Sequence, residues 1–389
     1  MSFDATPRTP ALKSRLPDVG TTIFSVMSAL AAKHGAVNLG QGFPDFDGDP
    51  KLVDAVAAAM RAGHNQYPPM PGVPALRQRL SEKIEHLYGH RYDPDTEITI
   101  TAGATQGILT AVLALVGPGD EVIVFEPCYD SYGPAITLAG ANVVRVPLDP
   151  RSFRIDFDRL RAALSPRTRA VIVNTPHNPS GTVWSVADRR ALAELLAPTD
   201  VLVLSDEVYE HMVFDGQAHA SASGDPQLAA RSLVISSFGK TYHVTGWKVG
   251  HVAAPAPLMA EFRKVHQFNV FTVNTPMQHG LAAHLADPAP YLGLPDFYQR
   301  KRDRFRAGVA GTRFDLLACA GTYFQCVDYS RISDLPDQAF CEWLTIEAGV
   351  AAIPLSAFYE TPPGQKVVRF CFAKKDDTLD EALRRLAAL

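Results

Sequence analysis

Two lysines follow a segment that has the composition of a buried strand. Residues 233–235 are leucine, valine and isoleucine, and the stretch Ser-Ser-Phe-Gly separates them from Lys240. Lys248 follows eight positions later. Burying an ammonium group costs free energy unless its charge is paired or its amine is used in chemistry. Two lysines in this position therefore indicate a functional site.

Three further predicted strands end in residues that could take part in chemistry. The run VLVLSDEVYE ends with Asp206 and Tyr209, and the run AVIVNTPHNPSG ends at Asn178. The run ITITAGATQG leads into a helix whose first N–H groups suit an anion. Ligands of parallel α/β sheets bind beyond the carboxyl ends of the strands. The four strand ends therefore predict one polar site at a single edge of a sheet.

Each of these features also has a purely structural explanation when it is taken alone. Asn178 precedes Pro179 and could belong to a turn, whereas Asp206 could cap the helix that follows it. Lys240 could be a surface lysine, and residues 103–105 match no phosphate-loop consensus. Because the four features fall at corresponding strand ends, a shared functional site explains them together.

The elements that must position these residues alternate between strands and helices from about residue 98 onward. The predicted strands are short apolar runs, which are typical of a parallel sheet buried on both faces. This pattern predicts an α/β fold whose large domain, residues 46–285, is a doubly wound, mostly parallel sheet. Residues 286–389 begin with a long predicted helix and continue with strand-like segments. Together with residues 1–45, they predict a smaller α+β domain.

The composition excludes several classes of protein. The 389 residues are 47% hydrophobic and 20% charged, with a formal net charge of −4. A chain of this length is expected to form at least two domains, and without a basic block it is not expected to bind nucleic acid. We expect neither a membrane span nor a metal site, because long apolar runs and His/Cys clusters are missing from the sequence. The five cysteines form no CxxC pair and no signal peptide is recognisable, so we expect reduced thiols and a cytoplasmic location.

Taken together, the motifs resemble those of a known family. The segments NTPHNPSG, SDEVYE and SSFGKTYHVTGWKVG, with LGQGFPDF and NQYPPMPGVPALR upstream, are similar to those of class I aminotransferases of fold type I, which depend on pyridoxal 5'-phosphate (PLP). The resemblance extends from about residue 24 to residue 369, with the motifs in the family's order. Within the family, VNLGQGFPDF and HQFNVFTVNTPMQ suggest the branch of the kynurenine/glutamine transaminases and the bacterial methionine aminotransferases. The resemblance implies the fold of a fold-type I PLP transferase.

The resemblance also implies roles in cofactor binding. Lys240 would be the covalent anchor of the cofactor and the base that moves the substrate's Cα proton, while Asp206 would keep the pyridine nitrogen protonated. Tyr209 and Asn178 would bind the phenolic oxygen of the ring. Lys248 would bind the phosphate, and its charge would lower the pKa of Lys240. The remaining groups implied for the phosphate and the face of the ring are Ser237, Tyr129 and the backbone of Ala104, Thr105 and Gln106.

A substrate carboxylate would be bound by an arginine of the segment KVVRFCFAK. Arg369 matches the family's carboxylate-binding arginine, whose fork suits bidentate hydrogen bonding, with Asn178 and the backbone of Gly42 beside it. Arg369 could instead face solvent on an alternating strand. Tyr129 could likewise be an ordinary core residue.

Aromatic residues are implied around the substrate side chain. Phe24 would line this pocket, together with Tyr67 and Phe271 of a neighbouring subunit, and Tyr67 would also contact that subunit's cofactor phosphate. The resemblance therefore implies a homodimer with shared active sites. Thr272 stands where related enzymes have an imidazole, and this difference favours methionine over kynurenine as the substrate.

The sequence thus predicts a PLP-dependent aminotransferase with a ping-pong mechanism. It would move the amino group of methionine, or of an aromatic or glutamine-type amino acid, to a 2-oxo acid. A cysteine-conjugate β-lyase and a succinyl-diaminopimelate aminotransferase are alternatives on the same scaffold. A regulator with an added DNA-binding domain is disfavoured, because residues 1–23 leave no room for that domain.

Overall fold

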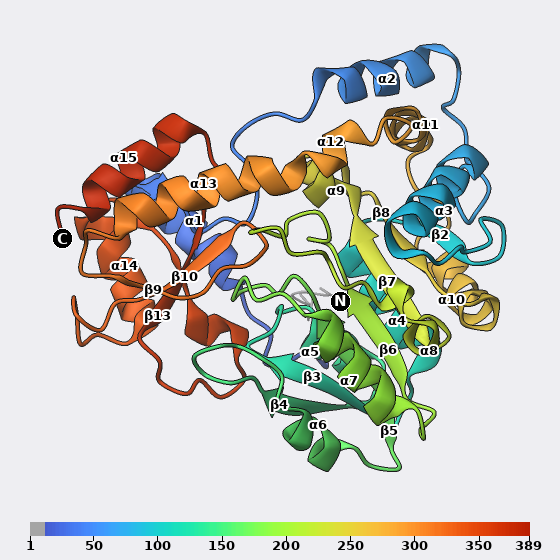
Figure 1. Cartoon of the computed structure of the whole chain (residues 1–389), viewed down its shortest axis with the longest axis horizontal. Helices are drawn as coiled ribbons and strands as arrows, with labels where there is room; N and C mark the ends of the chain where they lie inside the picture. Colours follow the sequence, from blue (N-terminus) through green and yellow to red (C-terminus); the bar gives the residue numbers. More distant parts are fainter. Residues whose placement is uncertain (1–11) are drawn as a thin grey trace, which may run out of the picture.

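A seven-stranded sheet, here called the large sheet, forms the centre of the molecule (Figure 1). The computed structural model describes residues 12–389. The strands of the large sheet are β2 (Ile98–Thr101), β3 (Glu121–Glu126), β4 (Asn142–Pro147), β5 (Thr168–Asn174), β6 (Leu202–Asp206), β7 (Ser232–Ser237) and β8 (Gly250–Ala253). Their spatial order is β2-β8-β7-β6-β5-β3-β4.

The large sheet is mostly parallel. Strand β8 pairs antiparallel with both β2 and β7, whereas the other neighbouring strands pair in parallel. Two successive antiparallel pairings give β2 the direction of β7, so the carboxyl ends of all strands except β8 lie at one edge. Every residue of β2, β3, β6 and β8 is buried. This burial explains why these strands are recognisable as continuous apolar runs.

Helices cover both faces of the large sheet. The apolar side chains of one face pack against α4 (Ala104–Leu115), α5 (Tyr132–Leu138) and α10 (Ala256–Asn269). Those of the other face pack against α6 (Phe157–Ala163) and α7 (Val186–Leu196). A third cluster next to β2 and β8 includes α2 (Pro50–Arg61), α3 (Pro74–Tyr88) and α11 (Thr275–His284). Two short helices, α8 (Pro226–Ala229) and α9 (Phe238–Thr241), lie on either side of β7 in the sequence.

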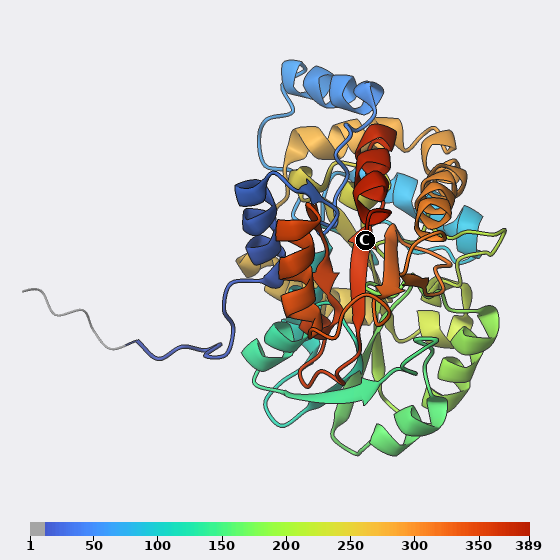
Figure 2. The same cartoon turned by 90° about the vertical axis from the view of Figure 1, so that its left-hand side faces the viewer.

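The last part of the chain folds around two smaller sheets. The first has the order β12-β13-β10-β9 and consists of β9 (Asp315–Leu316), β10 (Phe324–Asp328), β12 (Ile353–Pro354) and β13 (Val367–Cys371). In the second, β1 (Val37–Asn38) pairs in parallel with β11 (Val350–Ala351), which joins the N-terminal segment to the C-terminal part. The helices α1 (Ile23–His34), α14 (Asp337–Glu347) and α15 (Asp376–Leu386) pack beside these sheets (Figure 2).

A long helix connects the two parts of the molecule. The chain passes through α12 (Ala289–Leu292) into α13 (Leu294–Val309), which crosses from the side of α11 to α15 (Figure 1). This is the long helix that the sequence predicts at the beginning of residues 286–389. Its buried apolar residues, among them Tyr298 and Phe305, belong to a core cluster that also contains residues of both the large and the small sheets.

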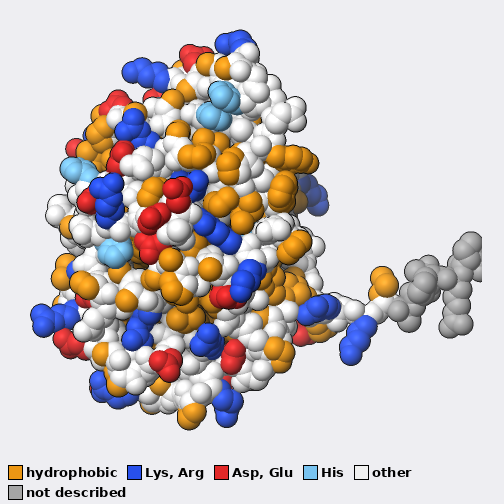
Figure 3. All heavy atoms as spheres, turned by 90° about the vertical axis from the view of Figure 1, so that its right-hand side faces the viewer, with side chains coloured by type: hydrophobic (Ala, Val, Ile, Leu, Met, Phe, Trp, Pro, Cys, Tyr) orange, Lys and Arg blue, Asp and Glu red, His pale blue; other side chains and the backbone are white. Residues whose placement is uncertain are grey.

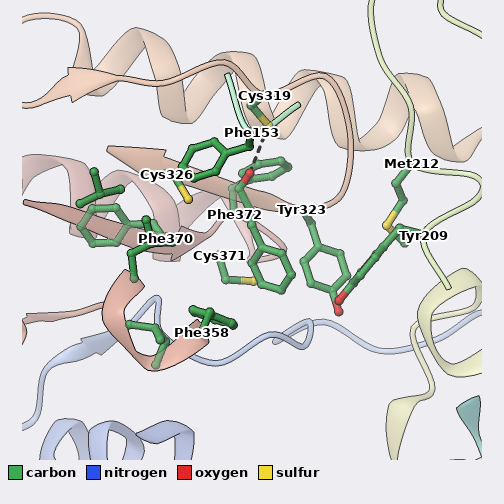
Figure 4. Close-up of a cluster of buried hydrophobic side chains, with 14 of the residues drawn as sticks. Phe153, Tyr209, Met212, Cys319, Tyr323, Cys326, Phe358, Phe370, Cys371 and Phe372 are labelled. Carbon is green, nitrogen blue, oxygen red and sulfur yellow. Dashed lines mark hydrogen bonds between the residues drawn. The ribbon is translucent and has the colours of Figure 1, made fainter. Parts of the chain in front are cut away.

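Figure 4 shows where the two parts meet in the hydrophobic core. Tyr209, from the segment after β6, points toward Tyr323, and Met212 lies beside Tyr209. The C-terminal residues Cys371 and Phe372 lie on the other side of Tyr323. All five side chains are buried. Packing against both parts of the molecule therefore holds the segment that follows β6 in place without a ligand.

The predicted α/β class and the mostly parallel large sheet are confirmed by the topology. One prediction was wrong in detail: β5 ends at Asn174, and Asn178 lies four residues beyond it, in the loop that follows. The division into residues 46–285 and residues 1–45 with 286–389 stays a prediction, supported by the separate strand sets of the large and small sheets. Within residues 12–389, no helix has both the length and the apolar character that crossing a membrane requires.

Candidate active site

A cavity of about 290 Å³ lies at the carboxyl edge of the large sheet, where the small sheets approach it. It receives residues from strand ends that are far apart in the sequence, as the strand-end argument predicts. The sequence-predicted residues that line it are Phe24, Gly42, Ala104, Thr105, Tyr129, Asn178, Asp206, Tyr209, Ser237, Lys240, Lys248 and Arg369.

Lys240 lies in α9, directly after β7, and its amine is held inside the cavity. The Nζ donates hydrogen bonds to the Tyr323 hydroxyl at 2.9 Å and to the Gly42 carbonyl at 3.2 Å. Burial lowers the pKa of Lys240 to about 8, and the charges of Arg369 and Lys248 act in the same direction. A substantial fraction of this amine is therefore neutral near pH 8, and a neutral amine can act as a nucleophile or as a base.

Asp206 is the last residue of β6 and is buried. Its Oδ2 accepts a hydrogen bond of 2.6 Å from the Tyr132 hydroxyl, and its Oδ1 accepts one of 3.3 Å from the Val208 N–H. Burial raises the pKa of Asp206 to about 6. No cationic side chain among residues 12–389 forms an ion pair with it. Such a carboxylate is suited to a cationic partner supplied by a ligand.

Two asparagines shape the loop after β5. The Asn174 side chain donates a hydrogen bond to the Asp206 carbonyl and accepts one from the Asn178 N–H. The Asn178 side-chain oxygen then accepts a 2.6 Å hydrogen bond from Arg369. Asn174 therefore connects two neighbouring strand ends and places Asn178 beside the arginine.

The start of α4 has the properties of an anion site. No side chain among the described residues caps its N-terminus, and Lys248 and Ser237 line the same part of the cavity. Gly103, which precedes α4, has a φ of +78°, and a Cβ there would lie 3.3 Å from the Lys248 Nζ. Free N–H groups at a helix start and an adjacent cation favour the binding of a phosphate. These residues supply both.

Arg369 is buried in the middle of β13 and is only 1% exposed. Its guanidinium donates hydrogen bonds to Asn178 and to the Gly40 carbonyl, while its Nε–H has no partner among residues 12–389. It packs over the ring of Phe324, 3.8 Å from the ring centroid, and forms no ion pair within the described part of the chain. Burial lowers the pKa of Arg369. An unpaired buried guanidinium beside a cavity is suited to a carboxylate ligand.

The two predicted tyrosines of the cavity approach it from different elements. Tyr209 is buried after β6, and its ring packs edge-on against that of Tyr323 at a centroid distance of 5.1 Å. Tyr129 precedes α5, and its hydroxyl lies 3.5 Å from that of Thr105. Tyr129 packs edge-on beside Tyr132, but it also lines the cavity. Its side chain is therefore available to a ligand.

Three predicted site residues do not line the cavity of this chain. The side-chain oxygen of Gln106 accepts a hydrogen bond from the Ala102 N–H. The backbone N–H of Gln106 is therefore the group of this residue that could bind an anion. Tyr67 and Phe271 pack edge-on against each other at a centroid distance of 5.3 Å and are 80% and 46% exposed.

Hydrophobic side chains also gather on part of the molecular surface shown in Figure 3, toward the side where the N-terminal segment leaves the body.

Sequence reasoning missed several residues of the site. Asn174 could have been found, because it is the true last residue of β5. Tyr132 lies one helical turn after Tyr129, a spacing without a motif of its own. Tyr323 and Phe324 lie where β10 begins, on an antiparallel strand to which the strand-end argument does not apply. Gln41 and Phe43 also line the cavity, on either side of Gly42.

The chain matches the family model described as aminotransferase class I and II over residues 34–386. It belongs to this family. The aminotransferase is 55% identical to methionine aminotransferase of Escherichia coli (strain K12) over 378 residues, which are 97% of this chain and 98% of the relative. It is 37% identical to kynurenine–oxoglutarate transaminase 3 of Rattus norvegicus, covering 95% of this chain and 88% of the relative.

Solved structures give the same result for the fold. A methionine aminotransferase from Escherichia coli superposes with a TM-score of 0.96 at 55% identity, covering 98% of this chain and all of that chain. N-Succinyldiaminopimelate aminotransferase from Mycobacterium tuberculosis superposes with a TM-score of 0.94 at 45% identity, covering 97% and 100% of the two chains. The expected enzyme class and the fold of the PLP transferases of fold type I are therefore confirmed, and the substrates of this enzyme class are amino acids and 2-oxo acids.

Proposed function

We propose that this aminotransferase uses PLP and takes its amino group preferentially from methionine, in a ping-pong reaction with a 2-oxo acid. The observation that carries the proposal is the cavity itself, which contains a lysine with a lowered pKa and a buried carboxylate. It also contains a helix start with a lysine beside it and a buried arginine, and among residues 12–389 no side chain caps the former and no carboxylate pairs with the latter. PLP presents an aldehyde, a ring nitrogen and a phosphate, and each of these finds a matching group here.

The residues of the chain would divide the work of holding the cofactor. Lys248, Ser237 and the first N–H groups of α4 would bind the phosphate. Asp206 would hold a proton on the ring nitrogen, Tyr209 and Asn178 would bind the phenolic oxygen, and Tyr129 would lie against the ring. When bound, PLP supplies a ring that accepts the electron pair released at the substrate Cα. Lys240 would attach the cofactor through its amine.

The remaining polar residues would orient the amino acid. Arg369 and Asn178 would hold the substrate carboxylate, so that the Cα–H bond points toward Lys240. The freed amine of Lys240 would then remove this proton and later return it. Because the pKa of Lys240 is about 8, the amine can accept a proton and release it again near neutral pH.

The preference for methionine rests on the apolar wall of the cavity and on the relatives. Phe24, Phe43 and Phe324 line the cavity, and a thioether side chain packs well against aromatic rings. The 55% identical relative is a methionine aminotransferase. Tyr67 and Phe271 would complete the pocket from the partner of a homodimer, and their exposure in the single chain supports this arrangement.

The five free cysteines are in keeping with the expected cytoplasmic location.

A single-turnover experiment tests the reaction and the donor together. Purified enzyme reconstituted with PLP is mixed with one amino acid and no 2-oxo acid. We expect methionine to yield one equivalent of its 2-oxo acid per site, faster than phenylalanine, glutamine, kynurenine or N-succinyl-diaminopimelate. A higher rate with N-succinyl-diaminopimelate, the substrate named for the 45% identical relative, would replace methionine as the donor. Pyruvate formed from a cysteine conjugate in preference to transamination would indicate a β-lyase.

The role of Arg369 predicts a selective loss in the variant Arg369→Gln. We expect kcat/KM for methionine to fall about 100-fold, because two charge-assisted hydrogen bonds to the carboxylate are lost. Methioninamide, which lacks the carboxylate, should react at nearly the same rate with the variant and with the parent enzyme. Steady-state kinetics with both compounds check this. An equal loss with the two compounds would mean that Arg369 supports the fold of the site rather than the carboxylate.

A further inference from the structure

The hydroxyl group of Tyr323 lies between the amine of Lys240 and the loop that contains Gly42. It donates a hydrogen bond of 2.6 Å to the Gly42 carbonyl and accepts one of 2.9 Å from the Lys240 Nζ. The same carbonyl accepts a second hydrogen bond from the amine at 3.2 Å. Three groups from three distant parts of the chain therefore form a closed triangle of hydrogen bonds.

Backbone hydrogen bonds of Thr322 and Tyr323 hold Tyr323 in position. The Thr322 N–H donates to the Met212 carbonyl, and the Phe372 N–H donates to the Tyr323 carbonyl, each at 2.9 Å. Thr322 is fully buried and has a φ of +65°, a left-handed conformation that is uncommon for a residue other than glycine. The segment after β6 and the end of β13 thus hold the tyrosine from both sides.

The ring of Tyr323 is also packed from several directions. Its centroid lies 4.8 Å from that of Phe324, 5.1 Å from that of Tyr209 and 5.7 Å from that of Tyr298. Figure 4 shows the ring of Tyr323 directed toward Tyr209. Burial raises the pKa of Tyr323 well above its ordinary value, so the hydroxyl stays protonated and keeps donating to the Gly42 carbonyl.

We propose that Tyr323 is a positioning residue that, with the Gly42 carbonyl, holds the Lys240 amine whenever this amine is not bonded to the cofactor. A neutral amine has two N–H donors and one lone pair. Tyr323 and Gly42 take up the two donors, which leaves the lone pair directed into the cavity. The amine is thereby oriented for attack on the cofactor and for removal of a proton. This inference rests on the role proposed above for Lys240.

The test compares two tyrosine-to-phenylalanine variants. Tyr323→Phe removes one of the two acceptors of the Lys240 amine and keeps the ring. Tyr298→Phe is the matched control, because the buried Tyr298 hydroxyl has no hydrogen-bond partner in the described part of the chain and its ring packs against that of Tyr323. The pKa of Lys240 is measured in the cofactor-free protein from the pH dependence of its acetylation by acetic anhydride, followed by peptide mass spectrometry. The other titratable groups that influence this amine are Asp206, Lys248, Arg369 and Cys371. The ring of Tyr209 also lies near it, with its centroid 5.8 Å from the Nζ, and both variants retain all of these residues.

We expect Tyr323→Phe to lower the pKa of Lys240 by about one unit, because an ammonium ion gains more from a hydrogen-bond acceptor than a neutral amine does. With cofactor and methionine, kcat should fall about 10-fold while KM changes little. Tyr298→Phe should leave both quantities unchanged. An unchanged pKa and kcat in Tyr323→Phe, or equal changes in the two variants, would overturn the proposal.

The proposal can also be tested if Tyr323→Phe does not fold, and its outcome can be separated from that of the proposed function. If Tyr323→Phe unfolds, 3-fluorotyrosine at position 323 keeps the ring, and its poorer acceptor oxygen should lower the pKa of Lys240 in the same direction. An unchanged pKa in that protein would also overturn the proposal. The acetylation experiment uses no cofactor, so a failure of the parent enzyme to transaminate would contradict the proposed function while the role of Tyr323 is still read from the pKa.

Discussion

Replacing Lys240 with arginine is expected to lower kcat for transamination at least about 10⁴-fold. The loss is this large because one amine has two functions: it attaches the cofactor and it moves the Cα proton. Arginine keeps the positive charge, but it is protonated at all working pH values and can serve neither function. The change is measured as the steady-state rate of 2-oxo acid formation from methionine.

Lys248→Arg is the matched control for this experiment. Position 248 is proposed to act only as a cation for the phosphate, and an arginine can supply that charge. We expect this variant to keep kcat within about 10-fold of the parent enzyme. If Lys240→Arg keeps more than a hundredth of the activity, or if Lys248→Arg is the more damaging change, the assignment of the two lysines is wrong.

The second large effect is expected for Asp206→Asn, which should lower kcat about 10³-fold. A neutral amide cannot keep a proton on the ring nitrogen, so the ring becomes a poorer acceptor of electrons. The affinity for PLP should also fall, and both are measured by titrating the cofactor-free variant with PLP and assaying the product. A variant with nearly full kcat would show that the carboxylate does not face the ring nitrogen.

The same substitution should stabilise the cofactor-free protein at high pH. In the folded chain the pKa of Asp206 is raised to about 6, whereas an unfolded aspartate titrates near 3.9. Between these values the unfolded state releases its proton first, so the group lowers the stability of the fold as pH rises from about 4 to 6. Above pH 6 the cost reaches about 3 kcal/mol, and asparagine does not carry it.

Thermal unfolding of the cofactor-free proteins at pH 5 and pH 8 measures this effect. Asp206→Asn should gain several degrees in Tm over the parent protein at pH 8 and less at pH 5. Asp54→Asn is the control, because Asp54 is exposed on α2, and its effect on Tm should be the same at both pH values. Equal gains for Asp206→Asn at both pH values would mean that the carboxylate is not penalised by burial.

The strand-end argument located the acidic and basic centre of the site but was less successful elsewhere. Asp206 and Lys240 were found because parallel strands carry their carboxyl ends to one edge. Asn178 was found for a partly wrong reason, since β5 ends at Asn174 and a hydrogen bond between the two asparagines carries Asn178 into place. Local sequence could not reveal this connection.

Residues from the small sheets were beyond this reasoning. Taken alone, Arg369 could have been a solvent-facing arginine of an alternating strand. It is buried because β13 is an inner strand between β12 and β10, and every residue of β13 is covered. Tyr323 reaches the site through a contact with Gly42, 281 positions away in the sequence. Such contacts follow from tertiary packing, and a single sequence carries no periodic signal for them.

The most direct test of the account is to find which amine bonds to the cofactor. The protein is incubated with PLP, the bond is fixed with borohydride, and the labelled peptide is identified by mass spectrometry. We predict one pyridoxyl group per chain, on Lys240. A label on Lys248 or on a surface lysine, or a chain that carries no stoichiometric label, would contradict the account.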